Sequence, residues 1–249
     1  TSNNTLESII ELDLEHEEYD LSTSFEMYET LEGSNSDRYQ YVLPSYNFSK
    51  NFYLENITGS FNFNAYGNNT LRDTNITSTS LFNDLNYSSF DTFFDNGAKT
   101  NFEISLKNVN TAGKNNPKYD ENLQTEFMSL YTYNASFPMI KKNSFSLNSL
   151  EPRLSLRLSP NDMKDNKILE RRIDINNVFN SNRLSMEDSF EGGESVTLGI
   201  NFKKEKVSTV NKLSEIEEYI DFKLASVFRL SEEKNIPTNS TLNKKQSNI

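Results

Sequence analysis

Apolar and polar residues alternate with a period of two along most of this chain. The segment 195–202 is an example, with apolar side chains at its even positions and polar residues or glycine at its odd positions. Successive side chains of a β-strand point to opposite faces, so such a segment forms a strand with one apolar and one polar face. Helical periodicity of any length is hard to find. The pattern therefore predicts an all-β protein.

The alternating segments are separated mostly by short polar turns, which predicts about ten antiparallel strands. A hairpin is expected within 10–27, followed by strands at about 38–53, 57–71, 72–87, 98–111, 121–136, 148–159, 191–206 and 215–231. Most of these exceed the roughly 5 to 6 residues of an average globular strand. A tilted strand that crosses a bilayer needs about 9 to 11 residues. Long strands in series favour a transmembrane β-barrel over a soluble sandwich, although alternation alone fits both.

Several of the polar faces carry full charges. In a barrel these residues would line a polar lumen while the apolar face meets lipid. The candidate lumen-lining residues are Glu11, Asp13, Glu15, Arg153, Arg157, Lys223 and Arg229. The acidic stripe in the first strand has two interpretations: it is a solvated face, or it is a negative patch in a confined lumen that attracts a basic partner or cations.

Composition excludes several classes of protein. With 35% hydrophobic residues and no long uncharged apolar run, no segment approaches the roughly 20 apolar residues of a membrane-spanning helix. The 12 Tyr and 18 Phe disfavour a disordered chain. The chain has no Cys, which excludes a disulfide framework and thiolate metal sites.

The net charge of -11 is concentrated at one end of the chain. Of the 36 acidic residues, 11 lie within 1–37, where there is no Lys or Arg, and the remaining 25 balance the 25 basic residues. A neutral remainder without a basic run argues against nucleic acid as a partner.

Catalytic chemistry is not indicated. His16 is the only histidine, so neither a zinc site built on several histidines nor a proton relay is expected. We find no Gly-rich phosphate loop, nucleophile elbow or calcium-loop spacing. The sequence therefore predicts no enzyme activity, no cofactor and no metal site.

The polar segment 176–202 resembles a motif of the lipopolysaccharide-assembly outer-membrane protein family LptD, also called OstA or organic solvent tolerance protein. The residues of the motif loop that carry the resemblance are Asn182, Arg183, Ser185, Asp188, Glu191, Gly192 and Gly193. Met186, Glu187 and Ser189 depart from the usual pattern. Four further stretches follow the family's order, namely RYQYVLPSYNF, ASFPMI, LEPRLSLRLSP and FKLASVFRL, so the resemblance spans about 38–249.

The resemblance implies a transport function in the cell outer membrane. Members of this family receive lipopolysaccharide from a periplasmic bridge protein through a jellyroll domain and insert it into the outer leaflet, with an LptE-like plug lipoprotein in the barrel. We expect residues 1–249 to be the central part of one such barrel, a fragment without the jellyroll domain or the gate strands. The alternatives are another outer-membrane barrel, such as a porin or receptor, and a secreted β-sandwich that binds carbohydrate.

The family resemblance and the alternation together assign the faces. The apolar residues expected to face lipid are Leu154, Leu156, Leu198, Ile200, Phe202 and Phe222. Asn182, Arg183 and Asp188 would either hold a folded loop together or contact the plug. Gly192 and Gly193 would supply a turn with positive φ before the strand resumes.

Overall fold

The computed structural model describes residues 4–32, 38–72, 75–143, 146–210, 213–242 and 245–249, and in these residues the protein is all-β with no α-helix. Within these described ranges, no helical segment is long and apolar enough to cross a membrane. The elements are β1 (Thr5–Glu15), β2 (Tyr19–Thr30), β3 (Tyr39–Phe52), β4 (Gly59–Arg72), β5 (Ile76–Ser89), β6 (Thr92–Phe93), β7 (Lys99–Lys114), β8 (Gln124–Ser136), β9 (Met139–Lys142), β10 (Ser146–Ser159), β11 (Gly193–Val210), β12 (Leu213–Arg229), a 3-10 helix η1 (Thr238–Ser240) and β13 (Gln246–Asn248).

The thirteen described strands form one antiparallel sheet. Their order is β1-β2-β3-β4-β5-β7-β8-β10-β11-β12-β13, while β6 pairs with β7 and β9 pairs with β10. The ten strands expected from alternation are all present. The additional three, β6, β9 and β13, have 2 to 4 residues each, which is too short for a periodic pattern to reveal. Among the described residues the sheet is not closed, because the strands at its two ends pair on one side only.

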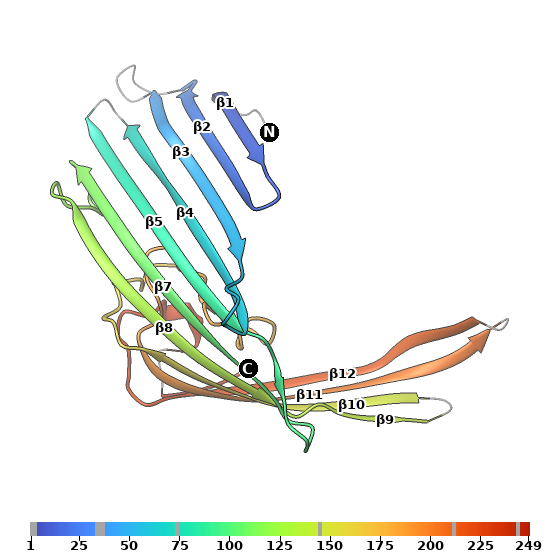
Figure 1. Ribbon diagram of the computed structural model, residues 1–249. Helices are drawn as coiled ribbons and strands as arrows, with labels where there is room; N and C mark the ends of the chain where they lie inside the picture. The colour runs from blue at the N-terminus through green and yellow to red at the C-terminus, as the bar shows by residue number, and fades with distance from the viewer. Residues whose placement is uncertain (1–3, 33–37, 73–74, 144–145, 211–212, 243–244) are drawn as a thin grey trace. The chain divides into compact units, whose positions relative to one another are not determined.

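The chain divides into two compact units, and the first comprises Thr1–Tyr87 and Ser105–Met128. Figure 1 shows its strands β1 to β5 side by side, from blue to cyan. Aromatic rings pack between neighbouring strands, as in the stacked pair Tyr66–Phe82 with centroids 5.0 Å apart. The buried Lys107 of β7 forms an ion pair with the partly buried Asp84 of β5, with Nζ 2.6 Å from Oδ1.

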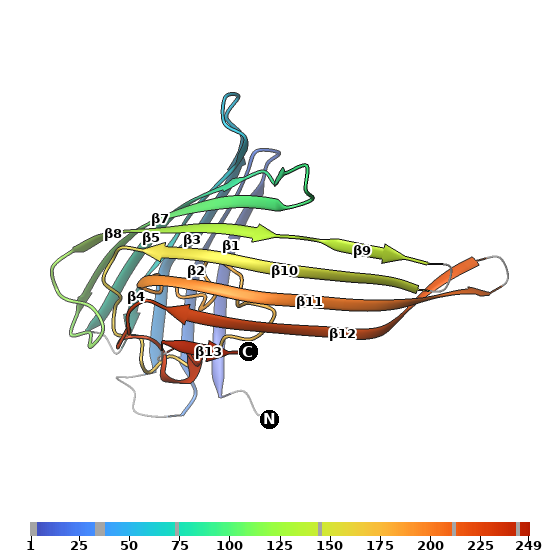
Figure 2. The same ribbon diagram turned by 90° about the horizontal axis from the view of Figure 1, so that it is seen from below.

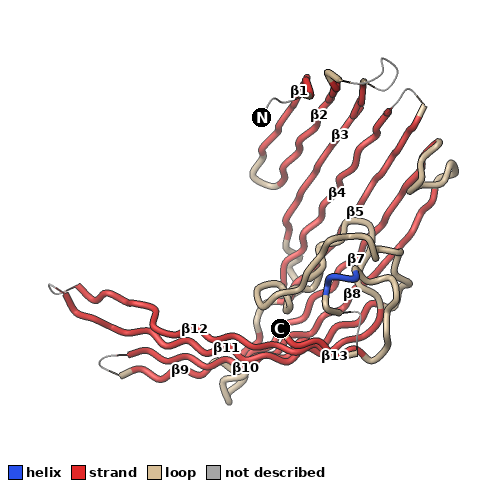
Figure 3. The backbone as a smooth tube through the Cα atoms, turned by 180° about the vertical axis from the view of Figure 1, so that it is seen from behind, coloured by secondary structure: helices blue, strands red, loops and turns tan. Residues whose placement is uncertain are grey.

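The second unit comprises Ser88–Ile104 and Ser129–Ile249. Its long strands β10, β11 and β12 lie side by side in Figure 2, with β13 beside β12. The β10–β11 pairing begins where Ser159 faces Gly193, so the segment 160–192 is one long loop between two paired strand ends. In Figure 3 this loop, in tan, lies near the blue 3-10 helix and the C-terminus.

The loop is anchored by its own hydrophobic core. The buried residues of this core come from the loop, from β12 and from the C-terminal segment, and they are Met163, Ile173, Val178, Leu184, Met186, Ala225, Val227, Ile236 and Leu242. Backbone bonds also join the loop to that segment, with Asn166 N donating to Asn235 O over 3.0 Å. The loop is therefore a packed structure that covers one face of β12.

Candidate functional site

Strand register sorts the side chains of the second unit into rows. Leu156 of β10 lies opposite Tyr133 of β8 on one side and Val196 of β11 on the other, and Val196 lies opposite Phe228 of β12. The neighbouring row on the other face contains Thr132, Arg157, Ser195 and Arg229. One face of β8, β10, β11 and β12 is therefore largely apolar, and the opposite face is polar.

The two faces have different surroundings. On the apolar face, Leu156 keeps 42% of its surface exposed and Leu198 keeps 49%. On the polar face, Arg157 and Arg229 are buried beneath the loop 160–192. By register, all six residues expected to face lipid lie on the apolar face. Their contact with lipid remains a prediction.

The seven candidate lumen-lining residues fall into two groups. Arg153, Arg157, Lys223 and Arg229 share the polar face of the second unit, whereas Glu11, Asp13 and Glu15 share one exposed face of β1 in the first unit. In the second unit, Arg157 and Arg229 are buried, while Lys223 is exposed and pairs with Asp221 over 3.5 Å. That these residues line a lumen remains a prediction.

A buried cluster of charges joins the loop to the strands. The carboxylate of Glu191 accepts two bonds from Arg183, at 2.7 Å from Nε and 2.6 Å from Nη2. Arg229 of β12 donates to the same carboxylate and, over 2.6 Å, to the carbonyl of Gly192. Arg157 of β10 donates over 2.6 Å to the backbone carbonyl of Glu191. We call Arg157, Arg183, Glu191 and Arg229 the arginine cluster.

Two hydroxyl groups of β11 also accept hydrogen bonds from Arg183. Its Nη1 and Nη2 donate to Thr197 Oγ1 and Ser195 Oγ, both over 3.1 Å. These hydroxyls lie on the polar face of β11, so the period-two pattern places them directly under the loop. Arg183 and Glu191 are each only 1% exposed in their side chains. Removal of either partner would leave uncompensated charge in a buried site.

The cluster controls the protonation of Glu191. Burial raises the pKa of this carboxyl group, but the attraction of Arg183, Arg157 and Arg229 and the bonds from Arg183 outweigh it, and the pKa falls from 4.5 to about 2. Glu191 is therefore ionised across the physiological range. Three guanidinium groups surround this carboxylate, and Glu233 also attracts Arg229. Arg157 Nη2 is buried without a hydrogen-bond partner among the described residues.

The remaining motif residues shape the loop. Asn182 O accepts from Ser185 N over 3.0 Å, and Asn182 Nδ2 donates to Met186 O over 3.2 Å, which closes a tight turn. Ser185 has a positive φ of 48° within this turn. Asp188 is buried at 8% exposure.

Of the two motif glycines, only one has the positive φ that the sequence analysis expects for both. Gly193 has a φ of 82°, as predicted for the turn that starts β11. The prediction is wrong for Gly192, whose φ lies outside the positive region. Gly192 has a different role, because the space around it is crowded. A Cβ at this position would lie 3.1 Å from Glu233 Oε2 and 3.2 Å from Asn161 O.

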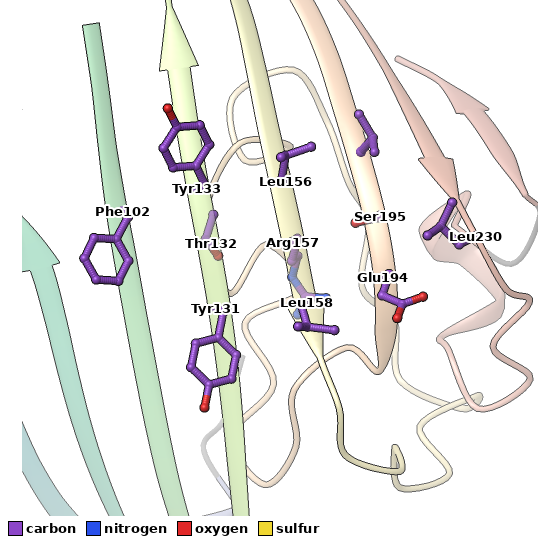
Figure 4. A pocket seen from close by; sticks show the side chains of 11 residues that line it. Phe102, Tyr131, Thr132, Tyr133, Leu156, Arg157, Leu158, Glu194, Ser195 and Leu230 are labelled. Atoms are coloured by element: carbon purple, nitrogen blue, oxygen red, sulfur yellow. The ribbon is translucent and has the colours of Figure 1, made fainter. Parts of the chain in front are cut away.

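Two hollows lie on opposite faces of the second unit. A groove of about 470 Å³ runs over the apolar face and is lined by Phe102, Tyr131, Tyr133, Leu156, Leu158 and Leu230, among others (Figure 4). A cavity of about 340 Å³ lies on the polar face, between β7, β8, β10 and residues 179–181 of the loop. We call the second hollow the polar cavity.

Of the residues that line the polar cavity, the sequence analysis named Arg153 as a candidate but not Glu103 or Ser181. Glu103 accepts bonds from Ser181 Oγ over 2.6 Å and from Asn134 Nδ2 over 3.4 Å. The alternation within 98–111 places Glu103 on a polar face, but only the folded loop brings Ser181 to it. Among the described residues, no group of three or more His, Asp or Glu side chains is arranged to hold a metal ion.

Comparison with protein families gives a match over the given sequence. The sequence model of the family described as "LptD: LPS transport system D" matches residues 1–249. A search of curated proteins finds none that matches this chain.

Proposed function

Because the chain belongs to the LPS transport system D family, we propose that it is part of the outer-membrane barrel that inserts lipopolysaccharide into the outer leaflet. The family is an outer-membrane component of lipopolysaccharide transport and not a family of enzymes. The observation that carries the proposal is the match over all 249 residues of the sequence. It favours this function over a porin, a receptor or a secreted carbohydrate-binding sandwich.

The two-faced sheet supports the proposal physically. In an outer-membrane barrel the residues of each strand alternate between lipid and lumen. The second unit has this alternation, with Leu154, Leu156 and Leu198 on one face and Arg153 and Arg157 on the other. The apolar face would contact outer-membrane lipid, and the polar face would enclose the path of the saccharide headgroup. No covalent step is required.

The partners follow from the same proposal. We propose that these strands form the central part of the barrel and that a jellyroll domain and the gate strands lie elsewhere in the protein. The jellyroll domain would receive lipopolysaccharide from the periplasmic bridge protein, and an LptE-like lipoprotein would plug the lumen. Copurification of such a lipoprotein with the full-length protein tests the second partner.

Depletion of the protein in its own bacterium tests the function. Newly made lipopolysaccharide, labelled metabolically, should stop reaching the cell surface, as measured by a lectin or antibody added to intact cells. A plasmid copy should restore it. Assembly of an unrelated outer-membrane barrel, followed in the same cells, is the control for general envelope damage. Unchanged surface lipopolysaccharide after full depletion would refute the proposal.

A further inference from the structure

The exposed apolar face of the second unit has a boundary that the strand register defines. On β10 its side chains extend from Leu150 to Leu158. This span fits the roughly 9 to 11 residues with which a tilted strand crosses a bilayer. At one end of it, Leu150 lies opposite Phe202 of β11, and Phe202 lies opposite Phe222 of β12. Aromatic residues border the apolar band of outer-membrane barrels, so this row marks one edge of the band.

The next row on the same face is basic. Lys204 follows Phe202 on this face of β11 and lies opposite Asn148 of β10, which in turn lies opposite Lys141 of β9. Lys206 comes next on the same face of β11. We call Lys141, Lys204 and Lys206 the lysine rim. Figure 2 shows β9, β10 and β11 side by side.

The lysine rim is open to a ligand. Lys141 and Lys206 are exposed, and neither takes part in an ion pair among the described residues. Lys204 is partly buried and has an interaction of its own within the protein. The two exposed ammonium groups are therefore the ones available to an anion.

The row of the rim that adjoins the apolar band carries only positive charge. Lys141 and Lys204 share this row with an asparagine of β10 and with Ile220 of β12. On this face the nearest acid in register is Glu217, which lies opposite Lys206 and so further from the band. The headgroups of a bilayer adjoin its hydrocarbon core, so a lipid phosphate would meet the cations first.

The lysine rim lies at the end of β10 and β11 that is opposite to the loop 160–192. At the rim's end, β11 ends at Val210 and β12 starts at Leu213, so the turn there is much shorter than that loop. In outer-membrane barrels the longer loops lie outside the cell and the short turns in the periplasm. The rim would then face the periplasmic leaflet, away from the leaflet that receives lipopolysaccharide. This step rests on the proposed function.

We infer that the lysine rim binds the phosphate of an anionic phospholipid in the periplasmic leaflet, while the acyl chains of that lipid lie against Leu150, Phe202 and Phe222. Ammonium groups donate charge-assisted hydrogen bonds to phosphate oxygens. The aliphatic part of a lysine lies along apolar surface while its charged end reaches the headgroups. A lipid without net charge should bind more weakly, because its own cation neutralises its phosphate.

Native mass spectrometry of the full-length protein in a neutral detergent tests this inference. The probes are phosphatidylglycerol, which is anionic, and phosphatidylcholine with the same acyl chains, which has no net charge. Each is titrated into the delipidated protein, and the bound lipid is measured. Phosphatidylglycerol should bind more tightly. Lys141→Gln combined with Lys206→Gln should reduce this preference, by about fivefold for each lysine removed.

Two further variants separate lipid binding from damage to the fold. Lys142→Gln combined with Lys203→Gln removes the same charge from the opposite face of β9 and β11, so it should leave the preference unchanged. Lys141→Arg combined with Lys206→Arg keeps both cations and should retain the preference. Folding of each variant is checked by its heat-modifiable mobility on gels.

The leaflet is tested separately in intact cells. Asn143→Cys places a thiol at the rim's end of β9, and Ile168→Cys places one on the loop 160–192, where Ile168 is 92% exposed. A membrane-impermeant maleimide should label Ile168→Cys in intact cells, and Asn143→Cys only after the outer membrane is permeabilised. Labelling of Asn143→Cys in intact cells would overturn the phospholipid assignment, because the rim would then meet lipopolysaccharide.

The outcomes distinguish this inference from the proposed function. If the protein exports lipopolysaccharide but binds the two phospholipids equally, or if Lys141→Gln with Lys206→Gln keeps the preference, the inference is wrong and the function stands. If phosphatidylglycerol binds through these lysines while depletion leaves surface lipopolysaccharide unchanged, the function is wrong and the rim remains a site for anionic lipid.

Discussion

At the scale of single residues, Glu191 joins the loop 160–192 to two strands of the second unit. Its carboxylate and backbone contact Arg183 in the loop, Arg157 in β10 and Arg229 in β12. One side chain therefore connects three parts of the chain that are distant in sequence. The burial of all four members makes each contact expensive to break.

Neutralisation of Glu191 should destabilise the protein. Glu191→Gln keeps the size of the side chain but removes the carboxylate that three buried guanidinium groups surround, so we expect a loss of about 3 to 5 kcal/mol in the free energy of unfolding. Thermal unfolding in detergent measures it. The exposed pair Lys167–Asp165 provides the control, because Asp165→Asn in a fully solvated pair should leave the stability nearly unchanged. Equal effects of the two substitutions would contradict the role of burial.

Acid should weaken the same cluster. The pKa of Glu191 is about 2 in the folded protein against 4.5 for the free group, so its contribution is fully present above about pH 4.5 and is lost as the pH falls toward 2. We expect a loss of about 3 kcal/mol over this window. The measurement is denaturant unfolding at several pH values, comparing the protein with Glu191→Gln. A difference between the two that persists undiminished at pH 2 would exclude the carboxylate as the cause.

At the scale of elements, the faces of the strands could be predicted from sequence, and the contents of the loop could not. Leu198 and Arg157 fall on the faces that alternation assigns them, because a strand has one period and the register preserves it. The partners of Arg183 could not be predicted in this way. Ser195 and Thr197 reach it only because the loop folds back over β11, a long-range contact with no periodic signature. The 3-10 helix and β13 were missed because each has only 3 residues, which is too short for a periodic pattern.

An added positive charge should destabilise the protein more on the apolar face of β11 than on its polar face. Leu198→Arg places a cation on the apolar face, and near the middle of a bilayer it should cost about 2 to 4 kcal/mol of folding free energy. Asn201→Arg places the same cation on the polar face and should cost less than about 1 kcal/mol. Refolding into lipid vesicles at a series of urea concentrations measures both. Equal costs would mean that the apolar face does not contact lipid.

At the scale of the whole molecule, the two units differ in what covers their strands. In the second unit, the packed loop 160–192 and the C-terminal segment cover the polar face of β12. In the first unit, β1 is exposed along its entire length and carries the acidic stripe of Glu11, Asp13 and Glu15. The acidic excess found in the sequence therefore belongs to an exposed strand, and its role as a solvated face or a negative patch remains a prediction.

Removal of the loop should open the polar face. Ser159 and Gly193 are paired, so a two-residue Asn-Gly turn can replace 160–192 and close a β10–β11 hairpin. Arg157 and Arg229 would then be hydrated instead of buried, and the strands should still pair. If the polar face encloses a lumen, the shortened protein should show higher conductance in planar bilayers. Shortening of the β7–β8 loop at 116–121 is the control, and equal conductance of the shortened and native proteins would exclude the loop as an obstruction.

The arginine cluster also has a consequence for the order of events during folding. Arg229 lies 38 residues after Glu191 and Arg157 lies 34 residues before it, so the cluster is complete only once β10, the loop and β12 have met. A loop that arrived after the surrounding strands had closed would have to carry a charged carboxylate past them into an already dry site. The loop must therefore fold while β10, β11 and β12 pair. The burial of the Glu191 carboxylate between the loop and the strands requires this order.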